Sequence, residues 1–596
     1  MDEYIEDEES AWDSCCFIGS EFCGGAHFDT GRCTANHGTP CSTCRDVVDL
    51  EKDMLEAWNH LQRLAEKRRT ILKEKANNIH DSIIQRLPVE LIELVFEFYV
   101  ESHNPFRDGR KSTFSKIECS APFVISSVCK AWRKLALSTP RLWTRMNIYI
   151  YSYDSLQVQS ELASQSLKRS KKHGIRLSIF DPGYKPGHAR QDNTYSTSWL
   201  GGSGWGSDSL SEVPIKGIDS SPLMNVLKSQ SSRWQMLDLA ARTVTMEELF
   251  SDLVSLPALE YLHIYSRNDN WNSKIGLPKT PLLRELELSS QESPFDLFSE
   301  SFGWARITRI SLGLIDAPEV FEIFRHAPLL EEFVLTPTSS YDGPGRKPPI
   351  THSNLKLLQL NLHQSDHGQA LWKRLTIPSL QTLALDIEGS SPPDWAPEFP
   401  FQHIITFLAR SRCVIRTFKL KSSARFTLTD EQLIRILEHM PSLTSLTFHN
   451  LGIIGTGSTW TTDTLWKRFC RRPNGHSSQS HDKFPLSIRH LELAGVRAFS
   501  WKWFLNALDV LRTRNSTANN KGHGLASTLL HDHRLHVSLK LMPVPSAAYK
   551  IDKPSAIRFK ACKEDGLMVL KLADYLEERD LLQEALILHG LADKDA

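Results

Sequence analysis

The chain lacks any apolar run long enough to cross a membrane, since no stretch reaches the ~18 consecutive apolar residues of a transmembrane helix. It also lacks an excess of either charge, because 70 Lys and Arg residues balance 70 Asp and Glu residues. Zero net charge argues against nucleic acids and anionic membranes as partners. The N-terminal sequence MDEYIEDEES is acidic, unlike a secretory signal or a transit peptide. The expected location is therefore cytoplasmic or nuclear, where thiols stay reduced.

Catalytic motifs are missing as well. The sequence contains no P-loop, no GxSxG nucleophile elbow, no HExxH zinc motif and no Gly-rich dinucleotide fingerprint. Its 23 histidines show no recognised pairing with a nucleophile. The sequence thus predicts a non-enzymatic protein with no catalytic residues and no cofactor.

Six of the 11 cysteines lie in residues 1–44, which we expect to be a disordered, Cys-rich tail with reduced thiols. Cys41 and Cys44 have the CxxC spacing of zinc ligands, and Cys33 and His37 could complete one zinc site. Because the second CxxC pair of a typical zinc module is missing, a metal-free tail is the leading expectation and a zinc site is the alternative.

A long amphipathic helix is predicted over residues 45–84, which contain no Pro or Gly. Its apolar residues recur at spacings of three and four, and Arg68 interrupts them. These apolar residues are Val47, Leu50, Met54, Ala57, Leu61, Leu64 and Ile71. Packing against the next domain and pairing in a coiled coil both explain such a seam.

The pattern apolar-x-x-apolar-x-apolar recurs ten times over residues 230–500. The copies begin at Trp234, Leu259, Leu283, Ile307, Leu330, Leu355, Leu380, Ile415, Leu443 and Ile488. The first seven start 25, 24, 24, 23, 25 and 25 residues apart, and helix-like pieces such as DEQLIRILEHMPSL lie between them. Each unit is then a strand followed by a helix, which predicts an α/β fold of stacked repeats.

This period resembles that of the leucine-rich-repeat family, which implies a solenoid with strands on its inner face. The family's asparagine after the last strand leucine is absent, so we expect an irregular solenoid. Residues 146–229 are expected to be a linking segment with a Gly/Ser-rich insertion, and 501–596 a C-terminal repeat and helical cap. The segments 174–180 and 540–544 are candidates for outlying strands.

A different motif occupies residues 85–145. The sequence LPVELIELVF (87–96) opens a predicted helix, and VCKAWRKLA (128–136) lies in a second one predicted from about Pro122 to Leu137. PRLW follows at 140–143. These residues resemble the F-box family, whose pattern is LPxE(L/I), a V(C/S)(K/R)xWRx(L/A) helix and PxLW. An insertion of about 20 residues between the helices departs from short F-boxes.

The F-box resemblance implies a small helical unit that binds a Skp-type adaptor, which connects it to a cullin–RING ubiquitin ligase. The implied adaptor-binding positions are Leu87, Pro88, Leu91, Ile92, Val95, Phe96, Trp132 and Leu135. Of these, Trp132 and Leu135 are expected mainly to pack the unit itself. The alternative is that the helices merely cap the solenoid.

The strands of a solenoid present alternate side chains to partners. With the repeat Leu and Ile residues facing the core, the candidates for substrate binding are Tyr261, His263, Tyr265, Glu285, Glu287, Arg309 and Lys419. Their mixed charges favour a protein or peptide over a polyanion. We therefore expect a substrate receptor whose partners are the adaptor, a cullin and an unknown protein. A non-ligase interaction scaffold and a zinc-dependent nucleic-acid binder are the alternatives.

Overall fold

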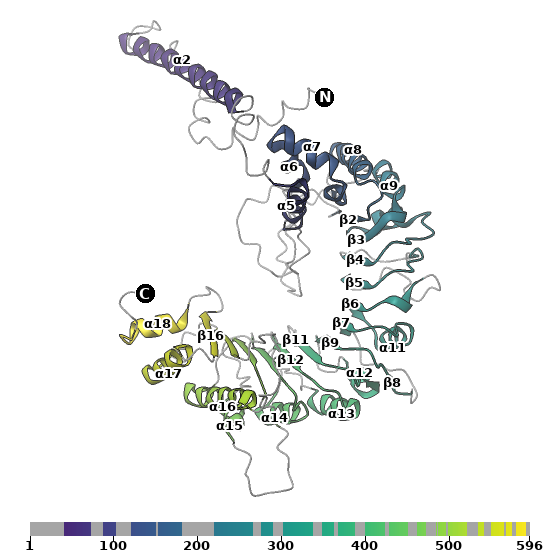
Figure 1. The fold of residues 1–596 in the computed structure, drawn as a ribbon, viewed down its shortest axis with the longest axis vertical. Coiled ribbons are helices and arrows are strands. Elements are labelled where there is room, and N and C mark those ends of the chain that lie inside the picture. The colour runs from purple at the N-terminus through teal and green to yellow at the C-terminus, as the bar shows by residue number, and fades with distance from the viewer. Residues whose placement is uncertain are drawn as a thin grey trace. The chain divides into compact units, whose positions relative to one another are not determined.

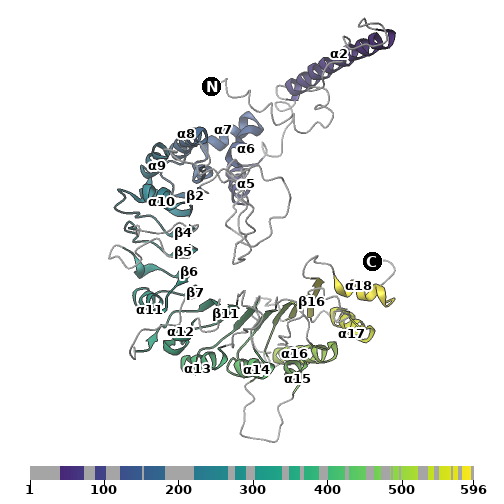
Figure 2. The same ribbon diagram turned by 180° about the vertical axis from the view of Figure 1, so that it is seen from behind.

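The computed structural model describes residues 41–72, 87–102, 121–150, 153–181, 220–265, 276–289, 302–337, 348–362, 368–387, 400–422, 428–450, 462–471, 484, 487–495, 499–520, 534–541, 550–564, 568–574 and 580–591. The chain divides into two compact units, residues 1–107 with 123–136 and residues 108–122 with 137–596. Figures 1 and 2 show the elements of each unit from opposite sides.

The described part of the first unit is helical. Its elements are α2 (Ser42–Ile71), α5 (Val89–Ser102) and most of α6 (Ala121–Val128) and α7 (Lys130–Ser138). The long helix predicted over residues 45–84 is confirmed by α2, which begins slightly earlier than predicted. Residues 73–84 of that prediction lie outside the described part of the chain.

The single helix predicted from Pro122 to Leu137 is wrong, because α6 and α7 are separate helices that meet at Cys129. The Cys129 sulfur accepts a hydrogen bond from the Trp132 amide at 3.4 Å, and its carbonyl accepts one from the Arg133 amide at 2.9 Å. Both hydrogen bonds satisfy backbone amides in the first turn of α7, where helix geometry leaves the first amides without an acceptor. The break contains neither Pro nor Gly, so the sequence carried no sign of it.

Among the described residues of the second unit, fourteen strands form one parallel sheet, in which neighbours in the sheet follow one another along the chain. They are β1 (Arg145–Tyr149), β2 (Ile175–Phe180), β3 (Trp234–Ala240), β4 (Tyr261–Tyr265), β5 (Glu285–Ser289), β6 (Arg309–Ile315), β7 (Glu332–Pro337), β9 (Leu357–Leu362), β11 (Thr382–Ile387), β12 (Thr417–Ser422), β13 (Ser445–Asn450), β14 (His490–Gly495), β15 (Leu535–Leu541) and β16 (Met568–Asp574). A two-stranded sheet pairs β8 (Ile350–Thr351) with β10 (Leu375–Thr376).

Helices follow most of these strands and cover one face of the sheet (Figure 1). They are α8 (Tyr153–Arg169), α9 (Ser221–Lys228), α10 (Thr243–Phe250), α11 (Ala317–His326), α12 (Gln369–Arg374), α13 (Phe401–Ser411), α14 (Asp430–Glu438), α15 (Asp463–Cys470), α16 (Trp501–Asn520), α17 (Lys553–Glu564) and α18 (Leu581–Leu588), with the 3-10 turns η5 (Pro140–Trp143), η6 (Ser231–Arg233) and η7 (Trp304–Arg306). Parallel strands alternating with helices confirm the predicted α/β solenoid of the leucine-rich-repeat type. Its irregularity appears in the helices, which range from six residues in α12 to 20 in α16.

All ten predicted repeat strands are present, as β3 to β7, β9 and β11 to β14. Their register aligns the repeat positions, so that Leu262 pairs with Leu286 and Leu286 with Ile310. These side chains join one continuous buried core that runs through the second unit. Burying one Leu or Ile is worth about 1.5–3 kcal/mol, so the aligned rows hold the repeats together.

The sheet extends beyond the predicted limits of 230 and 500 at both ends. The strands β1 and β2 lie in the segment predicted as a linker, and β15 and β16 follow the predicted array. The strand at 174–180 is confirmed by β2, whereas β16 lies where only helix was predicted. These end strands belong to the same sheet as the repeat strands. The array is therefore longer than the segment of residues 230–500 in which the repeat pattern was found.

The PRLW segment belongs with the sheet and not with the preceding helices. Leu142 and Trp143 of η5 are buried in the second unit, and the Arg169 guanidinium of α8 lies 4.5 Å from the centre of the Trp143 ring. The predicted domain limit at residue 145 is therefore too late, since the first unit ends at residue 136.

Acidic side chains at the start of two helices connect neighbouring repeats. Asp430 at the start of α14 accepts hydrogen bonds from the amides of Thr462 and Leu465, at 3.2 and 3.0 Å, where α15 begins. Asp463 accepts bonds from the Ser500 amide and hydroxyl, at 2.6 and 2.9 Å, where α16 begins. A helix N-terminus favours a carboxylate as hydrogen-bond acceptor. Because each carboxylate and its donors lie at the starts of consecutive helices, these bonds join consecutive repeats.

Candidate functional site

The helix α5 presents apolar side chains on two sides. Its first turn begins at Pro88, whose carbonyl accepts hydrogen bonds from the Leu91 and Ile92 amides at 3.0 and 3.2 Å. On one side Ile92 and Phe96 are buried, and the Phe96 ring lies 4.9 Å from that of Trp132. The contact between these rings joins α5 to α7 and leaves the other side of α5 open.

The open side of α5 is an exposed apolar stripe. Leu91, Leu94, Val95 and Phe98 make up this stripe. They recur at helical spacing, which places them on one face. Phe98 is 67% exposed and Leu94 57%, so the described residues leave most of the stripe uncovered. Contiguous apolar surface of this kind is typical of a site that another molecule covers.

The predicted adaptor-binding residues fall into two groups. Ile92 and Phe96 are buried, and Trp132 packs the unit as expected, while Leu135 and Leu87 are half-buried. Pro88, Leu91 and Val95 are exposed. Ile92 and Phe96 are therefore unsuited to direct contact with a partner, because they already pack inside the unit.

Leu94 and Phe98 were not among the adaptor-binding residues predicted from the sequence. Their spacing from Leu91 and Val95 follows the ordinary helical repeat, which was signal enough to find them. The F-box resemblance implied that Ile92 and Phe96 contact the adaptor together with Leu91 and Val95. The packing of Phe96 on Trp132 separates these two faces.

The inner face of the sheet at β3 to β5 holds a polar cluster around His263. The His263 Nδ1 atom lies 3.0 Å from Oδ1 of Asp238 on β3, and its Nε2 lies 3.6 Å from Oε1 of Glu287 on β5. The Tyr261 hydroxyl donates a hydrogen bond to the second Glu287 oxygen at 3.3 Å. The second oxygen of the buried Asp238 has no hydrogen-bond donor among the described residues. The cluster therefore keeps one acceptor that the described part of the chain leaves unused.

Charges in this cluster shift two pKa values. Burial disfavours the charged form of His263, but the hydrogen bond and charge of Asp238 and the charge of Glu287 outweigh it, so the pKa of His263 is raised. Burial and the carboxylates of Glu287, Asp238 and Glu285 raise the pKa of Tyr261. The negative charge of this cluster therefore favours the protonated, positively charged form of His263 and keeps the Tyr261 hydroxyl protonated.

The opposite end of the inner face is basic. Exposed Lys419 and Lys421 lie on β12, half-buried Lys540 on β15 and exposed Lys571 on β16. Glu492 on β14 lies 3.2 Å from the His449 ring, and this hydrogen bond lowers the pKa of Glu492, assisted by the nearby lysines. The inner face thus carries an acidic cluster over β3 to β5 and a basic region over β12 to β16, while Arg145 and Arg176 lie on the end strands β1 and β2.

A hollow of about 240 Å³ lies over β13 to β16 at the basic end. Its polar lining includes Ser445, Thr447, His490, Glu492, His536 and Lys571. The His490 and His536 rings stack at 4.9 Å. The small hydroxyl side chains of Ser445 and Thr447 lie among the larger lining residues of this hollow.

The seven predicted substrate-binding residues do not form one cluster. Tyr261, His263 and Tyr265 on β4 lie beside Glu285 and Glu287 on β5, in direct register. Arg309 follows on β6, where its Nε lies 3.5 Å from Glu332. Lys419 lies on β12 at the other end of the inner face. Asp238 was not predicted, although it occupies the alternating position next to His263 on β3, the first predicted repeat strand, because the candidate residues were taken only from Tyr261 onward.

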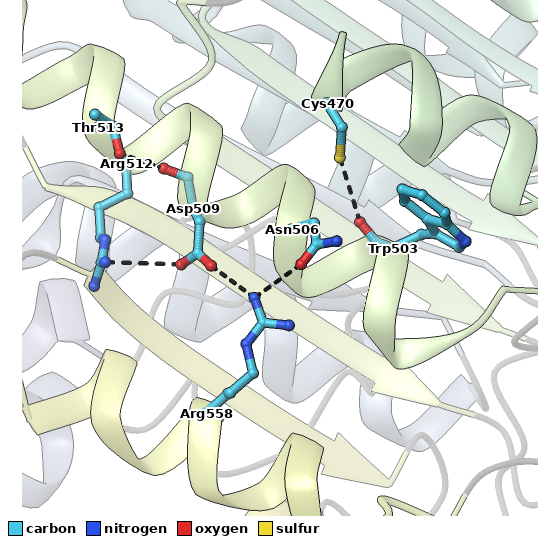
Figure 3. Close-up of polar contacts among 7 residues, drawn as sticks. All are labelled: Cys470, Trp503, Asn506, Asp509, Arg512, Thr513 and Arg558. Atoms are coloured by element: carbon cyan, nitrogen blue, oxygen red, sulfur yellow. Dashed lines mark hydrogen bonds and ion pairs between the residues drawn. The ribbon is translucent and has the colours of Figure 1, made fainter.

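Polar contacts join the consecutive outer helices α15, α16 and α17 to one another (Figure 3). Arg558 of α17 donates hydrogen bonds to Asp509 at 2.6 Å and to Asn506 at 3.1 Å, both on α16. Cys470 of α15 reaches the Trp503 carbonyl at 3.9 Å, and burial together with Asp509 raises the pKa of its thiol. These contacts pair consecutive helices, and a protonated thiol is a poor nucleophile.

The proposed zinc ligands are only partly covered by the described residues. The sulfur atoms of Cys41 and Cys44 lie 3.5 Å apart at the start of α2, whereas Cys33 and His37 lie outside the described residues. No group of three or more candidate metal ligands occurs within the part of the chain that the structure describes. Among the described helices, none is long and apolar enough to span a bilayer.

Comparison with known proteins does not place the chain in a family. No protein-family model matches it, and no curated protein is detectably similar in sequence. The resemblances to the F-box and to leucine-rich repeats therefore depend on the residues of this chain alone.

Proposed function

We propose that the chain is an F-box-type substrate receptor of a Skp–cullin–F-box ubiquitin ligase. In this role the protein makes and breaks no bonds itself. It holds a protein substrate beside the ubiquitin-carrying machinery and raises the effective concentration of the reacting groups. The site of action would be the cytoplasm or the nucleus.

The observation that carries the proposal is the exposed stripe of Leu91, Leu94, Val95 and Phe98 on α5. It lies in the segment with the LPxEL pattern, and the Trp of the WRxL pattern supports α5 from behind through the 4.9 Å contact of Trp132 with Phe96. An apolar stripe that its own helical unit leaves uncovered is the kind of surface that an adaptor would contact.

The inner face of the sheet supports the substrate half of the proposal. Its acidic end, with Asp238, Glu285 and Glu287, suits basic side chains, and its basic end with Lys419 and Lys421 suits acidic ones. Such a charge-separated surface selects a protein with a matching charge pattern and repels a uniform polyanion. Tyrosines beside the carboxylates add apolar contact area of the kind found at protein interfaces.

The test is co-purification of the full chain with a recombinant Skp-type adaptor. The double variant Leu94→Asp with Phe98→Asp should lose binding, because two charges would be desolvated in an apolar interface. Both side chains are exposed, so the helical unit should keep its circular dichroism. Val89→Asp is the matched control, since Val89 is an exposed apolar residue (49%) on the opposite side of the same helix.

Retention of the adaptor by the double variant, or failure of the unmodified chain to bind any Skp-type adaptor, would refute the ligase assignment. The inner face would then serve an interaction scaffold that acts without a ligase.

A further inference from the structure

The helix α2 is long and amphipathic. It contains 30 residues, and none of them is buried. Helices in proteins owe most of their stability to the packing of an apolar face, so a helix with no buried residue lacks its main source of stability. Its exposed apolar side chains include Leu50, Leu61, Leu64 and Ile71.

The apolar positions of α2 follow a heptad repeat. Val47, Leu50, Met54, Ala57, Leu61, Leu64, Arg68 and Ile71 alternate at spacings of three and four. The residues farthest from this seam, Lys52, Asn59 and Glu66, are polar. A seam at 3.5-residue spacing fits a second helix laid along its length, with each side chain inserted between four of the facing helix.

Charge is segregated along α2. Its N-terminal half contains the acidic Asp46, Asp49, Glu51, Asp53 and Glu56 against the basic Arg45 and Lys52. Its C-terminal half contains the basic Arg63, Lys67, Arg68 and Arg69 against the acidic Glu66. A parallel pair of such helices would set like charges side by side, whereas an antiparallel pair sets the acidic half of each helix against the basic half of the other.

We propose that α2 is a self-association helix, which pairs two copies of this chain as an antiparallel two-stranded coiled coil. Aligning the seams head to tail places Met54 of one copy against Leu64 of the other, and Ala57 against Leu61. The same alignment brings Asp53 of one copy beside Lys67 of the other along the edge of the seam. Both the apolar and the charged positions are then matched.

Arg68 decides between the two orientations. In a parallel pair, Arg68 would face the Arg68 of the second copy inside the seam, and the two buried cations would repel each other. In the antiparallel pair, Arg68 faces Leu50 of the second copy, and the neighbouring residues there are Asp49 and Glu51. The one charged position of the seam therefore meets opposite charge only in the antiparallel arrangement.

The first test is the mass of the full chain in solution by equilibrium sedimentation. We expect a dimer, and Leu61→Lys should raise its dissociation constant by more than about tenfold, because each dimer would bury two uncompensated charges. The control Asn59→Lys adds the same charge to the same helix away from the seam and should leave the dimer intact. A monomeric chain, or a dimer that Leu61→Lys leaves unchanged, would overturn the proposal.

The second test determines the orientation. In a chain carrying Met54→Cys and Leu64→Cys, mild oxidation followed by tryptic peptide mapping should link position 54 of one copy to position 64 of the other. Ten residues separate these positions, which is ~15 Å along one helix, so a link within a copy is excluded. Links between the two copies of position 54 would show a parallel pair and contradict the antiparallel assignment.

A charge reversal gives a third readout. Asp53→Lys alone should weaken the dimer by placing it beside Lys67 of the second copy. Adding Lys67→Asp should restore it, because the pair is then reversed and again complementary. If the double reversal fails to restore what the single one removes, the two positions do not meet and the proposed register is wrong.

Discussion

His263 on β4 shares a 3.0 Å contact with the buried Asp238 of the neighbouring strand β3. The two residues stand side by side in the register of the sheet, and Glu287 follows on β5. A carboxylate and an imidazole on adjacent strands couple the stability of the acidic end to pH. Their pairing connects the surface proposed for substrate binding to the stability of the repeats below it.

The raised pKa of His263 predicts a pH-dependent contribution to stability. The imidazolium is favoured in the folded state, so its contribution is complete below the ordinary value of 6.5 and is lost as the pH rises through the raised pKa. His263→Gln should therefore destabilise the protein more at pH 5.5 than at pH 8.5. Urea unfolding at several pH values measures this difference.

The control for this experiment is Asp238→Asn. In that background the effect of His263→Gln should depend much less on pH, because the carboxylate that raises the pKa is gone. An unchanged pH dependence would mean that Asp238 is not the source of the shift.

Asp430 is predicted to hold two repeats together. Asp430→Ala removes the acceptor for the Thr462 and Leu465 amides, and a buried donor left without a partner costs about 1–3 kcal/mol. The free energy of unfolding should fall by at least that order in chemical denaturation. Glu431→Ala is the matched control, since Glu431 is exposed one residue further along the same helix, and its effect should be small.

The aligned leucines are predicted to carry much of the stability of the solenoid. Leu360 is fully buried on β9, so Leu360→Ala should lower the free energy of unfolding by about 2–5 kcal/mol. Leu588→Ala serves as the comparison, because Leu588 is 70% exposed on α18. Its effect should stay within about 0.5 kcal/mol, as for most surface changes. Similar losses for both variants would contradict the assignment of Leu360 to the core.

The half-buried thiol of Cys413 is predicted to react slowly. Burial raises its pKa to about 11, so at neutral pH almost no reactive thiolate is present. When labelling of the folded protein by a thiol reagent is followed over time, Cys413→Ser should reduce the amplitude of the slow labelling phase. Loss of the fast phase in that variant would show that the thiol is accessible and ionised.

Local sequence patterns were sufficient to predict the repeat architecture. Alternating Leu and Ile positions at a period near 24 residues determine which side of each strand is buried, and such positions are legible without any tertiary information. The ten predicted strands are present for this reason, and so is α2, whose heptad seam is also a local pattern. The half-buried inner-face residues Tyr261, Glu285 and Glu287 follow from the same alternation.

Tertiary packing decided the rest. Ile92 and Leu91 look alike in sequence, but the ring contact of Phe96 with Trp132 buries one face of α5 and leaves Leu94 and Phe98 on the other. The break at Cys129, the extra end strands β1 and β16, and the carboxylates of Asp430 and Asp463 that join repeats depend on contacts between distant residues. Sequence by itself determined which side chains alternate, because that is a property of neighbours along the chain. Only the folded structure decided which apolar side chains remain uncovered, because burial depends on which residues meet in space.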